Sequence, residues 1–176
     1  PQDRAAEVFT HLDAEQQERL LEDLNNEQLA RLFNEMDPDD RVDLFEEMPG
    51  EVVAKLLALM APQERRATQI ILGYPPESVG RLMTPDYVTV RNEWTIDQAM
   101  AHIRKYGHDA ETLHTVYVID SGGKLTGYVR LRELVLADNE ATVESIANAS
   151  VVFLQADEDR EEAVRVMERY DLPVLP

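Results

Sequence analysis

Two acidic residues near the C-terminus occupy positions at which an earlier copy of the same helix has an arginine and a glycine. Glu168 corresponds to Arg104 and Asp171 to Gly107, at a constant separation of 64 residues. The C-terminal end of a helix carries partial negative charge, so carboxylates there are disfavoured unless a cation compensates them. The two replacements therefore predict a cation site at this helix end.

Motifs for catalysis do not occur in the sequence. The four histidines are scattered without HExxH spacing, and there is no GxSxG, Walker or dinucleotide fingerprint. The Gly122-Gly123 pair is typical of a hairpin turn and not of a phosphate-binding loop. We therefore expect a protein that is not an enzyme.

The charge balance favours cationic partners. The 176 residues carry 35 acids against 17 bases, a net charge of −18, and no cysteine. Such a chain repels phosphate backbones, so we expect no nucleic-acid partner. The absence of cysteine excludes disulfides and thiolate metal sites. No stretch approaches the ~20 apolar residues of a membrane span, so we expect the chain as given to be soluble.

A twelve-residue repeat organises the first part of the chain. Because twelve residues do not fill whole turns of a helix, one continuous helix would rotate its apolar stripe by about 120° per repeat. The chain must therefore turn in every repeat, and we predict six short helices stacked as a solenoid over residues 1–72. Large apolar side chains mark the repeat at Leu12, Leu24, Met36, Met48, Met60 and Leu72.

Helix-start signals fall at the repeat boundaries. Asp13 with Gln16, and Asn25 with Gln28, have the spacing of an N-cap and its N3 partner. Prolines near the later boundaries suit the first turn of a helix.

A different pattern begins after the Gly73-Tyr74-Pro75-Pro76 turn. It predicts a β-α-β-β-α unit, and a second, incomplete copy follows. The predicted domains are residues 1–77, 78–140 and 141–176. The predicted elements of the first copy are a strand at 87–90, a helix at 96–106, strands at 115–119 and 125–129, and a helix from about Leu131.

Three stretches of the sequence resemble a CBS domain. They are Met83-Thr84-Pro85, Val116 to Asp120, and Gly127 to Leu134. An acidic helical solenoid before a CBS pair resembles the cytosolic region of MgtE-family magnesium channels. The resemblance implies an α+β multidomain fold, with an N-terminal all-α superhelical solenoid followed by α/β CBS domains, the second of them truncated. It also implies a homodimer formed through the CBS domains, a transmembrane pore absent from this chain, and a place on the cytoplasmic face of the cell membrane.

The same resemblance implies Mg²⁺ as ligand and a gating function. Mg²⁺ between the acidic helical and CBS domains would favour a compact state that closes the pore. Mg²⁺ takes oxygen ligands and keeps several waters, which suits a few facing carboxylates. The implied ligands are Glu7 and Asp39 in the solenoid and Asp159, Glu161 and Asp171 in the second CBS unit; Glu168 is added from the comparison of the two copies.

Some of these acids also have a structural interpretation. Asp39 follows Pro38 and Glu161 follows Asp159, so both lie in a helix's first turn, where carboxylates are favoured. Asp159 with Glu162 has the spacing of an N-cap and N3 pair.

CBS domains of this kind also suggest ATP as a second ligand, with Arg132 and Glu133 as candidate nucleotide-binding residues. The sequence departs from the usual pattern, because Arg130 stands in place of a hydroxyl residue and Glu133 in place of Asp. Two alternative functions stay open. One is an adenine-nucleotide-sensing CBS module, and the other is a helical protein–protein adaptor.

Overall fold

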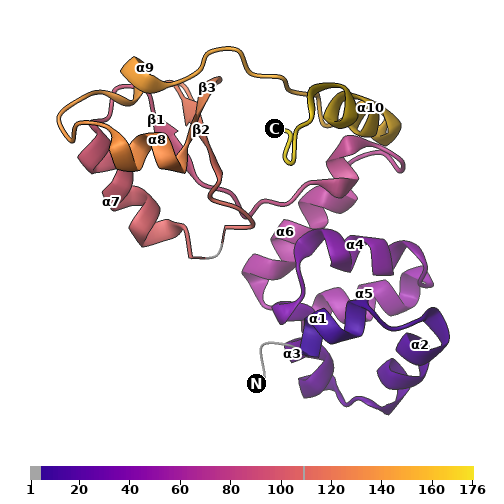
Figure 1. The fold of residues 1–176 in the computed structure, drawn as a ribbon. Coiled ribbons are helices and arrows are strands. Elements are labelled where there is room, and N and C mark those ends of the chain that lie inside the picture. Colours follow the sequence, from indigo (N-terminus) through magenta and orange to yellow (C-terminus); the bar gives the residue numbers. More distant parts are fainter. Residues whose placement is uncertain (1–4, 109) are drawn as a thin grey trace. The chain divides into compact units, whose positions relative to one another are not determined.

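The computed structural model describes residues 5–108 and 110–176, and these form two compact units (Figure 1). The helical unit contains the chain up to Thr84 together with Gln155–Glu162. The sheet unit contains Pro85–Leu154 and Ala163–Pro176. No helix in these ranges is both long enough and apolar enough to span a membrane.

The six short helices predicted for the first part of the chain are confirmed. Both predicted capping boxes are present. The side chains of Asp13 and Asn25 accept the backbone amides of Gln16 and Gln28, and their own backbone amides donate to the side-chain oxygens of these glutamines. The helices are α1 (Ala5–Thr10), α2 (Ala14–Asp23), α3 (Asn26–Glu35), α4 (Pro38–Glu46), α5 (Gly50–Leu59) and α6 (Pro62–Leu72).

The repeated apolar positions build the core of the helical unit. Met36 and Met60 follow directly after α3 and α5 and are only 2% and 4% exposed. Leu12, Leu24, Met48 and Leu72 pack against the same cluster. Helices contact their second neighbours, α1 with α3, α3 with α5 and α4 with α6, as expected for a stacked solenoid.

A buried arginine that the sequence pattern did not reveal joins α4 to α6. Arg41 is 1% exposed, and its Nη2 lies 2.7 Å from Oε2 of Glu64. Its Nη1 donates to the Thr68 hydroxyl (3.0 Å) and to the Glu64 carbonyl (3.2 Å). These bonds compensate the cost of removing the guanidinium from water.

The sheet unit contains three strands in the order β1-β2-β3. β1 (Thr89–Arg91) is parallel to β2 (Thr115–Ile119), which is antiparallel to β3 (Leu125–Arg130). α7 (Ile96–Tyr106) contacts β1, α8 (Leu131–Leu136) contacts β3, and the two helices contact each other, so they cover one face of the sheet. α9 (Val143–Ile146) packs on α8.

The predicted elements of the first copy are found with small shifts. β1 begins two residues later than predicted, since Tyr87 and Val88 precede its hydrogen-bonded register with β2. In the second copy, α10 (Arg160–Tyr170) forms, but residues 151–154 make no strand ladder. There the Leu154 amide donates to the Pro176 carbonyl at 3.1 Å.

A short 3₁₀ helix, η1 (Val79–Leu82), follows α6 and belongs to the helical unit. It contacts both α4 and α6.

Candidate functional site

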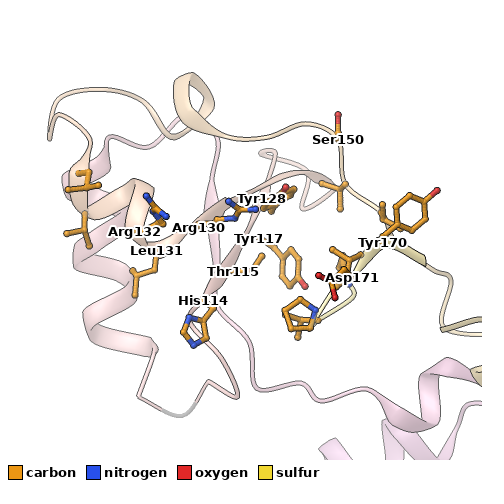
Figure 2. A pocket seen from close by; sticks show the side chains of 18 residues that line it. His114, Thr115, Tyr117, Tyr128, Arg130, Leu131, Arg132, Ser150, Tyr170 and Asp171 are labelled. Atoms are coloured by element: carbon orange, nitrogen blue, oxygen red, sulfur yellow. The ribbon is translucent and has the colours of Figure 1, made fainter. Parts of the chain in front are cut away.

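A cavity of about 860 Å³ lies within the sheet unit, on the face of the sheet that carries Tyr117 and Tyr128 (Figure 2). Strand alternation creates this face, because Val116, Val118 and Val129 are buried in the core and their neighbours point the other way. Thr115 pairs with Arg130, and Tyr117 with Tyr128, across the β2–β3 ladder.

The remaining walls come from α8, the chain around Ser150, the last residue of α10 and the segment that follows it. Figure 2 shows the Tyr117 ring and the Asp171 side chain directed toward the same space. Burial raises the pKa of Tyr117, so its hydroxyl keeps its proton at neutral pH. The cavity therefore combines aromatic surface and the His114 imidazole with the guanidinium groups of Arg130 and Arg132 and one carboxylate, Asp171.

Asp171 ends α10 in a left-handed backbone conformation. Its φ is 51°, and the Leu172 amide donates to the Met167 carbonyl at 3.0 Å, which is the bond of a Schellman helix end. Glycine is the usual residue in that conformation, although aspartate tolerates it better than most others. A non-glycine residue held there is compatible with a role for its side chain.

Gly107 ends α7 as expected, but its backbone is not left-handed. Its φ is −85°, so freedom of φ is not the reason for glycine here. A Cβ at Gly107 would lie 2.6 Å from the Ile103 carbonyl oxygen and 3.1 Å from a Leu113 methyl group. Close approach therefore explains the glycine of the first copy, whereas the unusual backbone belongs to Asp171 of the second.

The structure separates the two candidate nucleotide-binding residues. Arg132 lines the large cavity with Asp171, whereas Glu133 lines a neighbouring cavity of about 420 Å³. The Glu133 carboxylate already accepts the Arg130 amide at 3.0 Å, which caps the start of α8. Arg130 and Tyr128 line both cavities.

Asp159 caps the start of α10, as its spacing predicts, but its side chain bonds to the amide of Glu161 and not to that of Glu162. Its Oδ1 accepts the amide of Glu161 at 2.8 Å, while the Glu162 amide bonds to its backbone carbonyl at 2.9 Å. Both Asp159 and Glu161 are exposed and group with the helical unit. Glu168, near the other end of α10, is exposed and groups with the sheet unit.

Asp39 lies in the first turn of α4, as the sequence predicts, and is partly buried. Its Oδ1 is buried without a hydrogen-bond partner. Burial raises the pKa of Asp39, and the neighbouring charges of Asp37 and Asp43 raise it further. The pKa of Asp40 is raised by burial and by Asp39. The side chain of Glu7 lies outside the described part of the chain.

The predicted ligands do not form a ready-made metal site. Within the described ranges, no three acidic or histidine side chains converge closely enough to hold a metal ion. The structure places Arg132 and Asp171 around one cavity and leaves Asp39, Asp159, Glu161 and Glu168 outside it. Tyr117 and Tyr128 were not singled out from sequence, although the alternation of β2 and β3 places them on the face opposite the core. His114, which directly precedes β2, was not singled out either.

Family models match both units of the chain. Residues 1–77 match the MgtE intracellular N domain, and residues 79–140 match the CBS domain. The fold is also that of a solved structure, the cytosolic domain of the Mg²⁺ channel MgtE in complex with ATP. That structure is 36% identical, with a TM-score of 0.91 over 100% of this chain and 72% of the other. The soluble part of a magnesium transporter is 26% identical, with a TM-score of 0.91 over 99% of this chain and 69% of that one.

Curated relatives agree with these matches. The magnesium transporter MgtE of Thermus thermophilus is 39% identical over 118 residues, which is 67% of this chain and 26% of the relative. MgtE of Bacillus subtilis is 32% identical over 120 residues, 68% of this chain and 27% of the relative. The chain thus combines an MgtE-type helical domain with a CBS domain. It belongs to the MgtE family and spans about a quarter of the length of these relatives.

Proposed function

We propose that this chain is a cytosolic Mg²⁺-sensing regulatory region of a magnesium transporter. In this proposal, Mg²⁺ bound by carboxylates of the helical and sheet units favours a compact state that closes the pore. The observation that carries the proposal is the environment of Asp39. A carboxylate with an unpartnered buried oxygen and a raised pKa gains more from a cation than an ordinary surface acid does.

The charge distribution supports a response to cations in both parts of the chain. Residues 1–77 carry 18 acids and 7 bases, and residues 78–176 carry 17 acids and 10 bases. Without a divalent cation these two acidic surfaces repel each other, which favours separation. Mg²⁺ shifts that equilibrium only if it binds the compact state more tightly than the open one.

Small-angle X-ray scattering during a Mg²⁺ titration tests the proposal. We expect the radius of gyration to fall with Mg²⁺ and to stay unchanged with NaCl at matched ionic strength. Asp39→Asn and Asp171→Asn should each raise the Mg²⁺ concentration needed. Glu51→Gln, which removes an exposed first-turn acid from α5, should not. A titration that NaCl reproduces would refute a specific Mg²⁺ sensor.

The proposal extends to the assembly that the family implies. A homodimer formed through the CBS domains would let two copies act on one transmembrane pore at the cytoplasmic face of the membrane. Sedimentation equilibrium of this chain tests the dimer, and a monomer at all concentrations would contradict that part.

The large cavity favours a second ligand, an adenine nucleotide. Arg130 and Arg132 supply positive charge for phosphates, and Tyr117 and Tyr128 supply aromatic surface for a base. The related MgtE cytosolic domain that was solved in complex with ATP has the same fold. Because Glu133 already caps α8, we assign charge recognition to Arg132 and no ribose contact to Glu133.

Calorimetric titration with ATP tests this assignment. Arg132→Gln should weaken binding by about tenfold, since hydrogen bonds to charged groups contribute roughly 1.5–3 kcal/mol. Arg104→Gln, which removes an exposed arginine from α7, is the control. Equal affinity in the Arg132 variant and the wild type would exclude the assignment.

A further inference from the structure

Two connecting stretches of the chain, residues 77–82 and 155–160, lie side by side in the helical unit. We name them together the linker clamp. Ser78 and Asp159 form an antiparallel bridge at its centre. Backbone hydrogen bonds run from Val79 to the Glu158 carbonyl (2.8 Å), from Gly80 to the Ala156 carbonyl (2.7 Å) and from Arg160 to the Glu77 carbonyl (2.9 Å).

Glu77 and Arg160 close one end of the clamp. Besides accepting the Arg160 amide on its carbonyl, Glu77 pairs its carboxylate with the Arg160 guanidinium. The backbone of Glu77 has a φ of 64°, a left-handed conformation that is uncommon for a residue other than glycine. This conformation occurs in the residue whose carbonyl and carboxylate both contact Arg160.

The first stretch is fixed to the helices beneath it. Nε of Arg81 donates to the Tyr74 carbonyl at 2.8 Å, and its Nη1 lies 3.0 Å from Oε1 of Glu46 on α4. Gly80 lies against the Tyr74 ring, where a Cβ would come within 2.3 Å of a ring atom. The stretch at 77–82 therefore forms a firm support, and the stretch at 155–160 is held on it by few bonds.

The clamp determines which unit carries two of the proposed Mg²⁺ ligands. Asp159 lies within the clamped stretch, and Glu161 follows it directly and donates its amide to the Asp159 carboxylate. Both group with the helical unit, although α10 continues from Arg160 into residues of the sheet unit.

We propose that Glu77 and Arg160 are positioning residues that hold Asp159 and Glu161 on the helical unit. The role in Mg²⁺ binding rests on the proposed function, whereas the docking of the stretch does not. Under this proposal, the carboxylates of Asp159 and Glu161 are held in position before Mg²⁺ binds. Loosening the clamp would then weaken the Mg²⁺ response without removing any acid that binds the ion.

Hydrogen exchange measured by NMR on the whole chain tests the docking without Mg²⁺. Glu77→Arg places two positive charges together and removes the ion pair. It should speed exchange of the Val79, Gly80 and Arg160 amides by about two- to fivefold, the range expected for the loss of an exposed ion pair. Adding Arg160→Glu restores an opposite pair and the original net charge, so exchange should slow again.

Glu93→Arg is the matched control. It makes the same charge change beside Arg91 in the sheet unit, in an ion pair of similar exposure at 3.8 Å. Exchange at the three clamp amides should not change in this variant. Unchanged exchange at these amides in Glu77→Arg would overturn the docking role, whatever Mg²⁺ does.

A Mg²⁺ titration of the same proteins tests the positioning role. The midpoint of the Mg²⁺-dependent change in scattering should rise at least twofold in Glu77→Arg and return in the charge-exchanged double variant. Equal midpoints in Glu77→Arg and Glu93→Arg would overturn positioning while leaving the sensor in place. A wild-type chain that does not respond to Mg²⁺ would refute both the sensor and the positioning role, and the exchange experiment would still decide the docking.

Discussion

Replacing Asp39 by asparagine should stabilise the helical unit when Mg²⁺ is absent. The pKa of Asp39 is raised above its usual 3.8, chiefly by burial, so folding disfavours the ionised carboxylate despite its place at the start of α4. Desolvating a polar group costs roughly 1–3 kcal/mol, and more when the group is charged. Asparagine keeps a polar atom at this place but removes the charge, and partial burial of Asp39 favours the lower end of the range. We expect Asp39→Asn to raise the free energy of unfolding by about 1 kcal/mol at pH 7.

The effect should depend on pH with a definite sign. Because the folded pKa lies above the unfolded one, the folded state binds the proton more tightly and loses stability as pH rises from 3.8 through the folded value. At lower pH both states are protonated, so the penalty vanishes. The advantage of Asp39→Asn should therefore be absent in acid and fully present at neutral pH.

Mg²⁺ should reverse the order of stability. If Asp39 binds the ion, Mg²⁺ at ten times its dissociation constant stabilises the wild type by about 1.4 kcal/mol. The variant should gain little, so the wild type becomes the more stable protein. Exchange of the slowest α4 and α6 amides reports this unit, whereas fluorescence of Trp94, the only tryptophan, reports the sheet unit.

Glu51→Gln provides the comparison, since it removes a first-turn acid that is exposed. It should lose the few tenths of a kcal/mol that a helix dipole contributes and should keep the Mg²⁺ response. An Asp39→Asn protein that is less stable than the wild type without Mg²⁺ would refute the assignment of a burial penalty. A variant that gains as much from Mg²⁺ as the wild type would refute Asp39 as a ligand.

Three further substitutions test the packing. Asp171→Gly should stabilise the end of α10 by about 1 kcal/mol because glycine adopts the left-handed backbone freely, and hydrogen exchange of the last α10 amides measures this gain. Gly107→Ala should destabilise the sheet unit by about 1–3 kcal/mol because the added Cβ meets the Ile103 carbonyl, and Trp94 fluorescence during thermal unfolding measures this loss. Arg41→Met should cost about 3 kcal/mol by leaving the Glu64 carboxylate and the Thr68 hydroxyl without their buried partner, and faster exchange of the α4 and α6 amides would measure it.

The helical fold was predictable because its signals are local. Each repeat has its own cap and its own apolar residue, and capping pairs such as Asp13 with Gln16 act within a few residues. The burial of Arg41 was not predicted, because its partners Glu64 and Thr68 lie 23 and 27 residues later in the chain, on α6. Nothing in the sequence near Arg41 distinguishes it from a solvent-exposed arginine, and only the contact between α4 and α6 makes it a core residue.

The site was predictable in part, and the limits have physical causes. Comparison of the two copies singled out Asp171 from its replacement of Gly107, and the structure gives Asp171 an unusual backbone and a place on the cavity. The comparison argued from the helix dipole and did not reveal why the first copy has glycine. The structure shows that Gly107 is required by close packing against the Ile103 carbonyl and not by its φ. A residue type alone does not separate these two causes, since both exclude most side chains.

Asp159 illustrates how a structural role and a proposed functional role can share one carboxylate. Its Oδ1 caps α10 through the Glu161 amide, which uses one lone pair and fixes the orientation of the side chain. A carboxylate has about four acceptor sites, so this bond leaves oxygen ligands for a hydrated Mg²⁺. Capping therefore does not argue against metal binding here. It lowers the entropy that an ion must remove from the side chain, and the linker clamp lowers the entropy of the backbone in the same way.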